Sequence, residues 1–137
     1  MTNTVAQPTA LYSNTAITTA LTGVTGSSFN FGAYSQLSLY SIFTYGSGGT
    51  TAKAWVQASY DGGTTWMDIA NFAATTASKT RAYNLTRAAV TSIATPADAS
   101  LADDTSVNGF LGPLIRVKVT TTGTYAATTW AIYGFAQ

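Results

Sequence analysis

The sequence predicts an all-β protein: an antiparallel β-sandwich, or a jelly-roll-like variant of one, with about seven or eight strands. Two patterns indicate this class. Apolar and polar residues alternate over several short segments, and turn signals recur every 8 to 15 residues or so, whereas no segment shows the 3.6-residue period of a helix. The composition agrees, because threonine, alanine, serine and glycine make up over half of the chain and threonine favours pleated, half-buried surface.

The length of 137 residues fits one domain with an N-terminal extension. Residues 1–28 are predicted to be an N-terminal arm with a first short strand, and residues 29–137 a single β-sandwich domain. Five of residues 1–10 are Thr, Asn or Gln, one is Pro and the apolar residues are scattered, so we expect this part of the arm to be flexible and to become ordered against a neighbour. The short strand is expected at residues 16–21.

Strand signals are clear in the first half of the predicted sandwich. Residues 34–45 carry apolar side chains on both parities, which predicts a central strand. Residues 52–60 alternate, and residues 66–72 follow after a tight Asp-Gly-Gly turn, which predicts a β-hairpin. Residues 83–93 are predicted as a weaker strand, and their pattern also fits a short helix.

The C-terminal strands have the most regular pattern in the chain. In residues 114–122 Ile, Val and Val alternate with Arg, Lys and Thr, which predicts one buried and one solvated face. Residues 125–135 are predicted to return as the partner strand. Gly123 lies in the connecting turn, at a position where a positive φ is expected.

Residues 96–108 are predicted to form a long loop or lid, because they combine Pro, Ala and Ser with three of the five acidic residues. These acids are Asp98, Asp103 and Asp104. Their spacing is not that of an EF-hand, and the chain has no glutamate for a bidentate position, so we predict no metal site. We expect the loop to be solvated or to meet a basic partner.

The composition argues against an enzyme. The chain has no histidine and no cysteine, and no pair of carboxylates fits acid/base catalysis, so we predict no catalytic residue and no cofactor. Six scattered basic residues and a net charge of +1 disfavour nucleic-acid binding. No apolar run reaches the ~18 to 20 residues of a membrane span, and the N-terminus lacks a leader pattern, so we expect synthesis in a cytoplasm and no membrane partner.

The most specific local motif spans residues 59–66, Ser-Tyr-Asp-Gly-Gly-Thr-Thr-Trp. It resembles the Asp-box hairpin of sialidase-like propellers, in which the motif lies away from the active site. The resemblance implies a structural turn and no catalytic role. In that turn Asp61 accepts hydrogen bonds from turn amides, the glycines permit positive φ and the Trp packs beside the hairpin. The residues assigned to it are Ser59, Asp61, Gly63, Thr65 and Trp66.

Charged residues make up only 8% of the chain, where a free soluble domain carries about 25%. We infer that other protein chains cover much of the exterior, which also shields the edge strands of a sandwich. The residues predicted to lie at such an interface are Lys53, Trp55, Arg116 and Lys118. An alternative use of the aromatic residues is sugar stacking, with Trp55 and Trp66 on paired strands as in a carbohydrate-binding module.

Residues 54–70, 101–109 and 111–125, about half of the chain, resemble small structural proteins of tailed bacteriophages and prophages. The resemblance implies a non-enzymatic virion component. The expected role is a capsid decoration or cement protein that binds the major capsid protein on the capsid surface as a homo-oligomer, expected to be a trimer. A tail, neck or head-fibre protein of the same virion, and a carbohydrate-binding β-sandwich module, remain as alternatives.

Overall fold

The computed structural model describes residues 8–87 and 92–137 and confirms the all-β class. Eleven strands and no helix are found in these residues, and every strand pair is antiparallel. Seven strands have eight or nine residues and four have only two, so the predicted seven or eight matches the long ones. The strands are β1 Thr9–Ile17, β2 Val24–Thr25, β3 Phe29–Asn30, β4 Gln36–Thr44, β5 Ser47–Gly48, β6 Thr51–Ser59, β7 Met67–Ala74, β8 Lys79–Thr86, β9 Leu114–Thr122, β10 Tyr125–Ala126 and β11 Thr128–Ala136.

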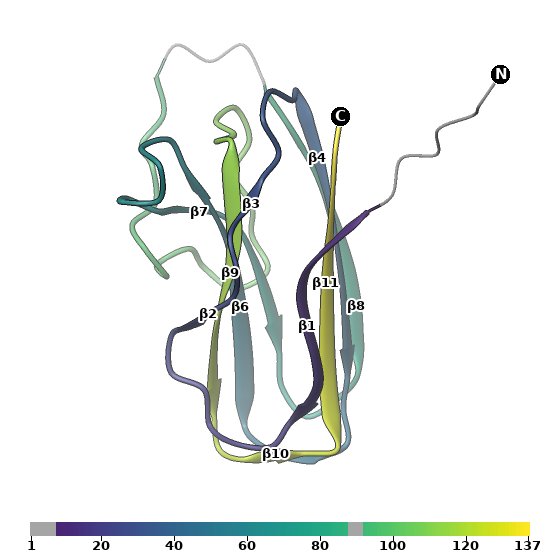
Figure 1. Cartoon of the computed structure of the whole chain (residues 1–137). Helices are drawn as coiled ribbons and strands as arrows, with labels where there is room; N and C mark the ends of the chain where they lie inside the picture. Colours follow the sequence, from purple (N-terminus) through teal and green to yellow (C-terminus); the bar gives the residue numbers. More distant parts are fainter. Residues whose placement is uncertain (1–7, 88–91) are drawn as a thin grey trace, which may run out of the picture.

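Two sheets face each other (Figure 1). The four-stranded sheet has the order β1-β11-β4-β8, and the five-stranded sheet has the order β2-β9-β6-β7, with β3 also paired to β9. A short ribbon of β10 and β5 lies at the end of the sandwich opposite the C-terminus (Figure 1). Gly123, in the turn before β10, has a φ of +72°, as its turn position predicted.

The core fills the space between the two sheets. Alternation produces it: in β9 every second residue from Ile115 is buried, while the intervening residues are only half-buried. Trp130 is the largest fully buried side chain; its indole N–H donates to the Ser41 hydroxyl at 2.8 Å, and its ring meets Phe43 edge to face. The core cluster contains buried apolar residues of both sheets, and burying each large apolar side chain contributes about 1.5–3 kcal/mol, so the core holds the two sheets together.

The N-terminal prediction is partly wrong. The first strand is β1, nine residues long, and not a short strand at residues 16–21. Its sequence hides the strand because two irregularities in the pairing with β11 interrupt strict alternation. Leu11 and Ile17 of β1 are buried, and β2 pairs with β9, so residues 9–25 contribute to both sheets. The predicted flexible segment, residues 1–10, lies mostly outside the described residues.

β4, β6, β7, β9 and β11 lie close to the positions expected, but β11 is not the partner strand of β9, as the sequence predicted. β9 pairs with β6 in the five-stranded sheet, whereas β11 pairs with β1 and β4 in the four-stranded sheet, because the chain crosses from one sheet to the other through β10.

β4 lies between β11 and β8, which confirms a central strand, and β6 and β7 form the predicted hairpin. Only one face of β4 is buried, however, since Tyr40 is 46% exposed on the other. β8 begins at Lys79, four residues earlier than predicted, and ends at Thr86, so residues 87, 92 and 93 of the predicted strand are not in it. Residues 88–91 lie outside the described residues.

Candidate binding surface

The turn between β6 and β7 is held by one carboxylate. Asp61 accepts hydrogen bonds from the Thr65 amide at 2.8 Å, from the Thr65 hydroxyl and from the Ser59 hydroxyl at 2.9 Å. The Gly63 amide donates to the Ser59 hydroxyl, and the Trp66 indole N–H donates to the Gly63 carbonyl, both at 2.9 Å. The five residues assigned to a structural turn therefore bond to one another within it.

These bonds also set the acidity of Asp61. The hydrogen bonds from the hydroxyl and the amide of Thr65 are the main reason that its pKa falls to about 2. A carboxyl group with so low a pKa stays ionised at neutral pH and is the acceptor that the turn requires. It is not poised to donate a proton.

A second polar network lies on the outer face of the five-stranded sheet, where residues 97–108 pass over β6 and β7. Its anchor is Asp68, which is fully buried. One carboxylate oxygen accepts the Gln57 amide at 2.8 Å and the Ala99 N–H at 3.0 Å, and the other accepts the N–H groups of Ser100 at 2.7 Å and Leu101 at 2.8 Å. A strand side chain thus supplies the acceptors for three successive loop amides.

Two further strand residues complete the attachment. Asn71 is fully buried; its side-chain oxygen accepts the Asp104 N–H at 3.0 Å, and its backbone N–H donates to the Thr105 carbonyl at 2.8 Å. The Trp55 indole N–H donates to the Leu101 carbonyl at 3.0 Å. The loop also forms a bridge between Ser106 and Ala70, so it protects part of the β7 edge from pairing with another chain.

A β-bulge explains why these polar side chains share one face. The register of β6 against β7 shifts between Val56 and Gln57, so that both Asp68 and Asn71 point away from the core although they are three residues apart. Regular alternation would have turned one of them into the apolar interior.

The acidic loop is paired with basic residues of the same chain. Asp98 lies 3.0 Å from the Lys118 ammonium and 3.9 Å from the Arg116 guanidinium. Asp104 lies 2.5 Å from the Lys79 ammonium, and Lys53 meets Asp103 at 3.0 Å. The expected basic partner of this loop is thus supplied by the protein itself.

The four residues predicted to lie at an interface all contact this loop or residues next to it on the sheet. Lys53 and Lys118 are paired with loop aspartates, and Trp55 is only 8% exposed beneath the loop. Arg116 donates to the Gln57 side chain at 2.8 Å and lies 4.2 Å above the centre of the Trp66 ring. The three basic residues among them are therefore already paired with aspartates of the same chain.

Sequence reasoning missed the residues that fix the loop: Gln57, Asp68 and Asn71. The available signal was the position of these three polar residues in the strands. Each interrupts a mainly apolar strand, at a point where a strand of a soluble sandwich usually carries a solvent-facing residue. A Pro- and Asp-containing loop of the right length follows in the chain. Without knowledge of the bulge, polar strand residues followed by such a loop are only a weak signal that the loop docks on them.

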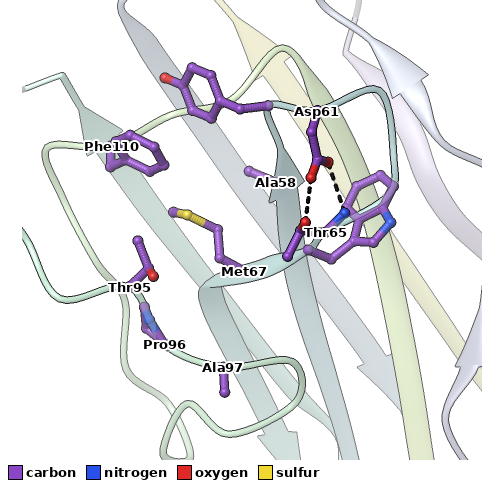
Figure 2. Close-up of a pocket in the computed structure, with 10 residues that line it drawn as sticks. Ala58, Asp61, Thr65, Met67, Thr95, Pro96, Ala97 and Phe110 are labelled. Carbon is purple, nitrogen blue, oxygen red and sulfur yellow. Dashed lines mark hydrogen bonds between the residues drawn. The ribbon is translucent and has the colours of Figure 1, made fainter.

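Beside the Asp61 turn lies an open groove of about 440 Å³. Figure 2 shows Phe110, Thr95 and Pro96 on one side, Asp61 and Thr65 on the other, and Met67 between them. The rings of Tyr60 and Phe110 lie 4.5 Å apart, and Tyr60 is 53% exposed. The lining is mainly apolar and aromatic, which suits the flat face of a ligand better than an ion.

Trp55 and Trp66 do not form the paired platform of the carbohydrate hypothesis. Trp55 lies under the loop, with its N–H bonded, and one face of Trp66 carries the Arg116 guanidinium. Only Trp66 lines the groove, where it joins Tyr60 and Phe110.

In the described part of the chain no cluster of three or more potential ligand side chains could hold a metal ion. No described helix is long and apolar enough to cross a membrane.

The fold and this surface define a class: an antiparallel β-sandwich in which one outer sheet face is bonded to the acidic loop of the same chain. Comparisons of the chain with protein-family models, with curated proteins and with solved structures find no match. A functional proposal therefore rests on the residues themselves.

The lowered pKa values of Asp98 and Asp104 predict that the fold loses stability in acid. Burial raises the pKa of Asp98, but hydrogen bonds from Gln57 and Lys118 and the nearby positive charges outweigh burial and lower the pKa below its ordinary value. Asp104 follows the same pattern, with Lys79 as its main partner. A carboxyl group with a lowered folded-state pKa stabilises the fold above its unfolded pKa of ~3.9, and this contribution is lost as the pH falls through the folded pKa.

We therefore expect the urea midpoint to be flat from about pH 7 to pH 5 and to fall between about pH 4 and pH 2. In an Asp98→Asn variant the fall should be shallower, because one of the titrating groups is absent. A midpoint unchanged down to about pH 2 would contradict the assigned pairings.

Proposed function

We propose that this protein is a non-enzymatic structural protein of a bacteriophage virion, a decoration or cement protein that binds the head shell as a homo-oligomer. The observation that carries the proposal is that the few charged side chains of the protein form bonds within the fold. All five aspartates accept bonds within the fold, and five of the six basic residues pair or bond internally. The remaining surface is polar or apolar but mostly uncharged, which fits a molecule packed among other protein chains.

The proposed partners are further copies of this chain and the major capsid protein, with the capsid surface as the site and the host cytoplasm as the place of synthesis. Repetition makes such binding effective: a modest contact of about 1,200–2,000 Å², repeated over a lattice, gives avidity without a tight single site. The resemblance of residues 54–70, 101–109 and 111–125 to phage structural proteins supports this reading.

Copy number separates this role from its nearest rival. We expect quantitative mass spectrometry of purified particles that contain the protein to give hundreds of copies, and electron microscopy to place them on the head. A dozen or fewer copies at the neck or tail would replace decoration with a tail, neck or head-fibre role.

The groove supports a second candidate function, glycan binding. Its residues differ from those first expected: Tyr60, Trp66 and Phe110 take the place of a Trp55–Trp66 pair. We expect a binding glycan, found by array screening, to lose at least about fivefold in affinity in Tyr60→Ala, since stacking on an exposed ring contributes about 1 kcal/mol or more. Tyr40→Ala, a similarly exposed tyrosine on the other sheet, is the matched control. Equal loss in both variants would reject the groove.

A further inference from the structure

We propose that the outer face of the four-stranded sheet binds the same face of a second copy of this chain. The proposal rests on the homo-oligomeric state in the proposed function and assigns the surface that forms it; it replaces the trimer expected from the sequence with a pair. We call this surface the neutral face. Its centre consists of Tyr40, Ile42, Thr80, Ala82, Ala131 and Tyr133.

Charge is distributed unequally between the two sheets. Lys79 and Arg81 are the only charged residues in β1, β4, β8 and β11. They stand opposite Phe43 and Ser41, on the inward parity of β4, and their side chains reach Asp104 of the loop. The neutral face therefore has no charged side chain among the residues that the structure describes.

A neutral surface favours a second copy over a charged partner. Two-fold pairing brings each surface patch against its own equivalent region, so a charge on the patch would meet a like charge at close range. The outer face of the five-stranded sheet is less suited to such pairing, because the loop already lies over it and its aspartates are paired with Lys53, Arg116 and Lys118. The neutral face meets no such cost.

The side chains on the neutral face have the character of an interface. Tyr40 and Tyr133 are direct cross-strand neighbours on β4 and β11, and Ile42 stands opposite Ala131. Tyr40 is 46% exposed, and Tyr133 and Ile42 are half-buried. Tyrosine is enriched at protein interfaces, and the small alanines and threonines around the pair leave a flat surface on which another sheet can pack.

The size of the face is also sufficient. Four strands at ~4.8 Å spacing and about nine residues at ~3.3 Å rise give a sheet face of roughly 570 Å². Two copies would bury roughly 1,100 Å², near the ~1,000 Å² that a specific interface requires. Figure 1 shows the four strands β1, β11, β4 and β8 as a continuous layer, whereas the long loop lies at the other sheet.

Sedimentation equilibrium tests the pairing. We expect the full chain to show a mass of two chains of 14.2 kDa each. Tyr133→Lys should raise the dissociation constant by more than about a hundredfold, because two-fold pairing places two new like charges in the contact. Val24→Lys is the matched control: Val24 is 43% exposed on β2 of the other sheet, and this variant should remain paired.

Cross-linking keeps the proposal testable if Tyr133→Lys does not fold. The chain has no cysteine, so Ala131→Cys introduces a single thiol near the centre of the neutral face. A short bismaleimide should join two copies through it efficiently at low protein concentration, whereas Thr25→Cys, exposed on the other sheet, should remain largely uncoupled.

A mass of one chain at all concentrations, a mass of three chains, or equal cross-linking at both cysteines would overturn face-to-face pairing. A three-chain mass would leave the proposed decoration role intact. Tail or neck placement in particles would instead remove that role without affecting the paired mass in solution.

Discussion

Asp68→Ala is expected to lower the free energy of unfolding by about 3–5 kcal/mol. The substitution removes a fully buried carboxylate and leaves the amides of residues 99–101 and the Gln57 side chain without an acceptor. Asp68→Asn should recover only part of the lost stability, since the NH₂ group of the asparagine would face N–H donors and could not accept their hydrogen bonds. Urea unfolding followed by tryptophan fluorescence measures the change.

The matched control is another aspartate of the same network. Asp103→Ala removes an ion pair with Lys53 in which the aspartate side chain is 52% exposed, and exposed pairs contribute about 0–1 kcal/mol. Limited proteolysis adds a local readout, because in Asp68→Ala residues 97–108 should be cut before the strands. An Asp68→Ala variant as stable as Asp103→Ala would show that the carboxylate does not anchor the loop.

Trp130→Ala is expected to cost about 3–5 kcal/mol, the usual range for deleting a large buried aromatic side chain. The indole is 1% exposed, contacts the Phe43 ring at 5.0 Å between centres and donates to the Ser41 hydroxyl. Its removal leaves a cavity between the two sheets and an unpartnered hydroxyl on β4.

Val24→Ala provides the comparison for Trp130→Ala, since Val24 is 43% exposed and its truncation should change stability by less than about 0.5 kcal/mol. Thermal unfolding monitored by circular dichroism records both variants. Similar midpoints for the two would mean that the sheets are not held together through Trp130.

The fold class follows from the sequence because alternation survives in long strands such as β4 and β9. In β9 the apolar residues from Ile115 onward fall on one parity, and the pattern alone identifies the buried face. β1 shows the opposite case. Its pairing is irregular at two points, so Leu11 and Ile17 look isolated in the sequence although both lie in the core.

The candidate site was only partly predictable for a similar reason. The Asp61 turn is local, and the eight-residue motif contains every partner that its hydrogen bonds need. The docking of residues 97–108 is not local, since Asp68 lies about thirty residues before its partners and faces them only because of the bulge in the hairpin. Long-range pairing of this kind leaves no periodic signal.

The docking of residues 97–108 also explains why the sequence predicts Lys53, Arg116 and Lys118 to lie at an interface with another chain. Lys53, Arg116 and Lys118 stand on outward positions of β6 and β9, where a sequence shows cations but not their counter-ions. The structure brings Asp98 and Asp103 to them. The proposed role therefore places the contacts with other chains on mostly uncharged surface.

Binding of the purified protein to the head shell tests this role most directly. Particles from a phage that encodes the chain, stripped of it or assembled without it, are mixed with rising amounts of the protein and pelleted. The decoration role predicts saturable binding at hundreds of copies per particle, with little dependence on salt because the contact is nearly uncharged. Protein that stays in the supernatant at every concentration would contradict it.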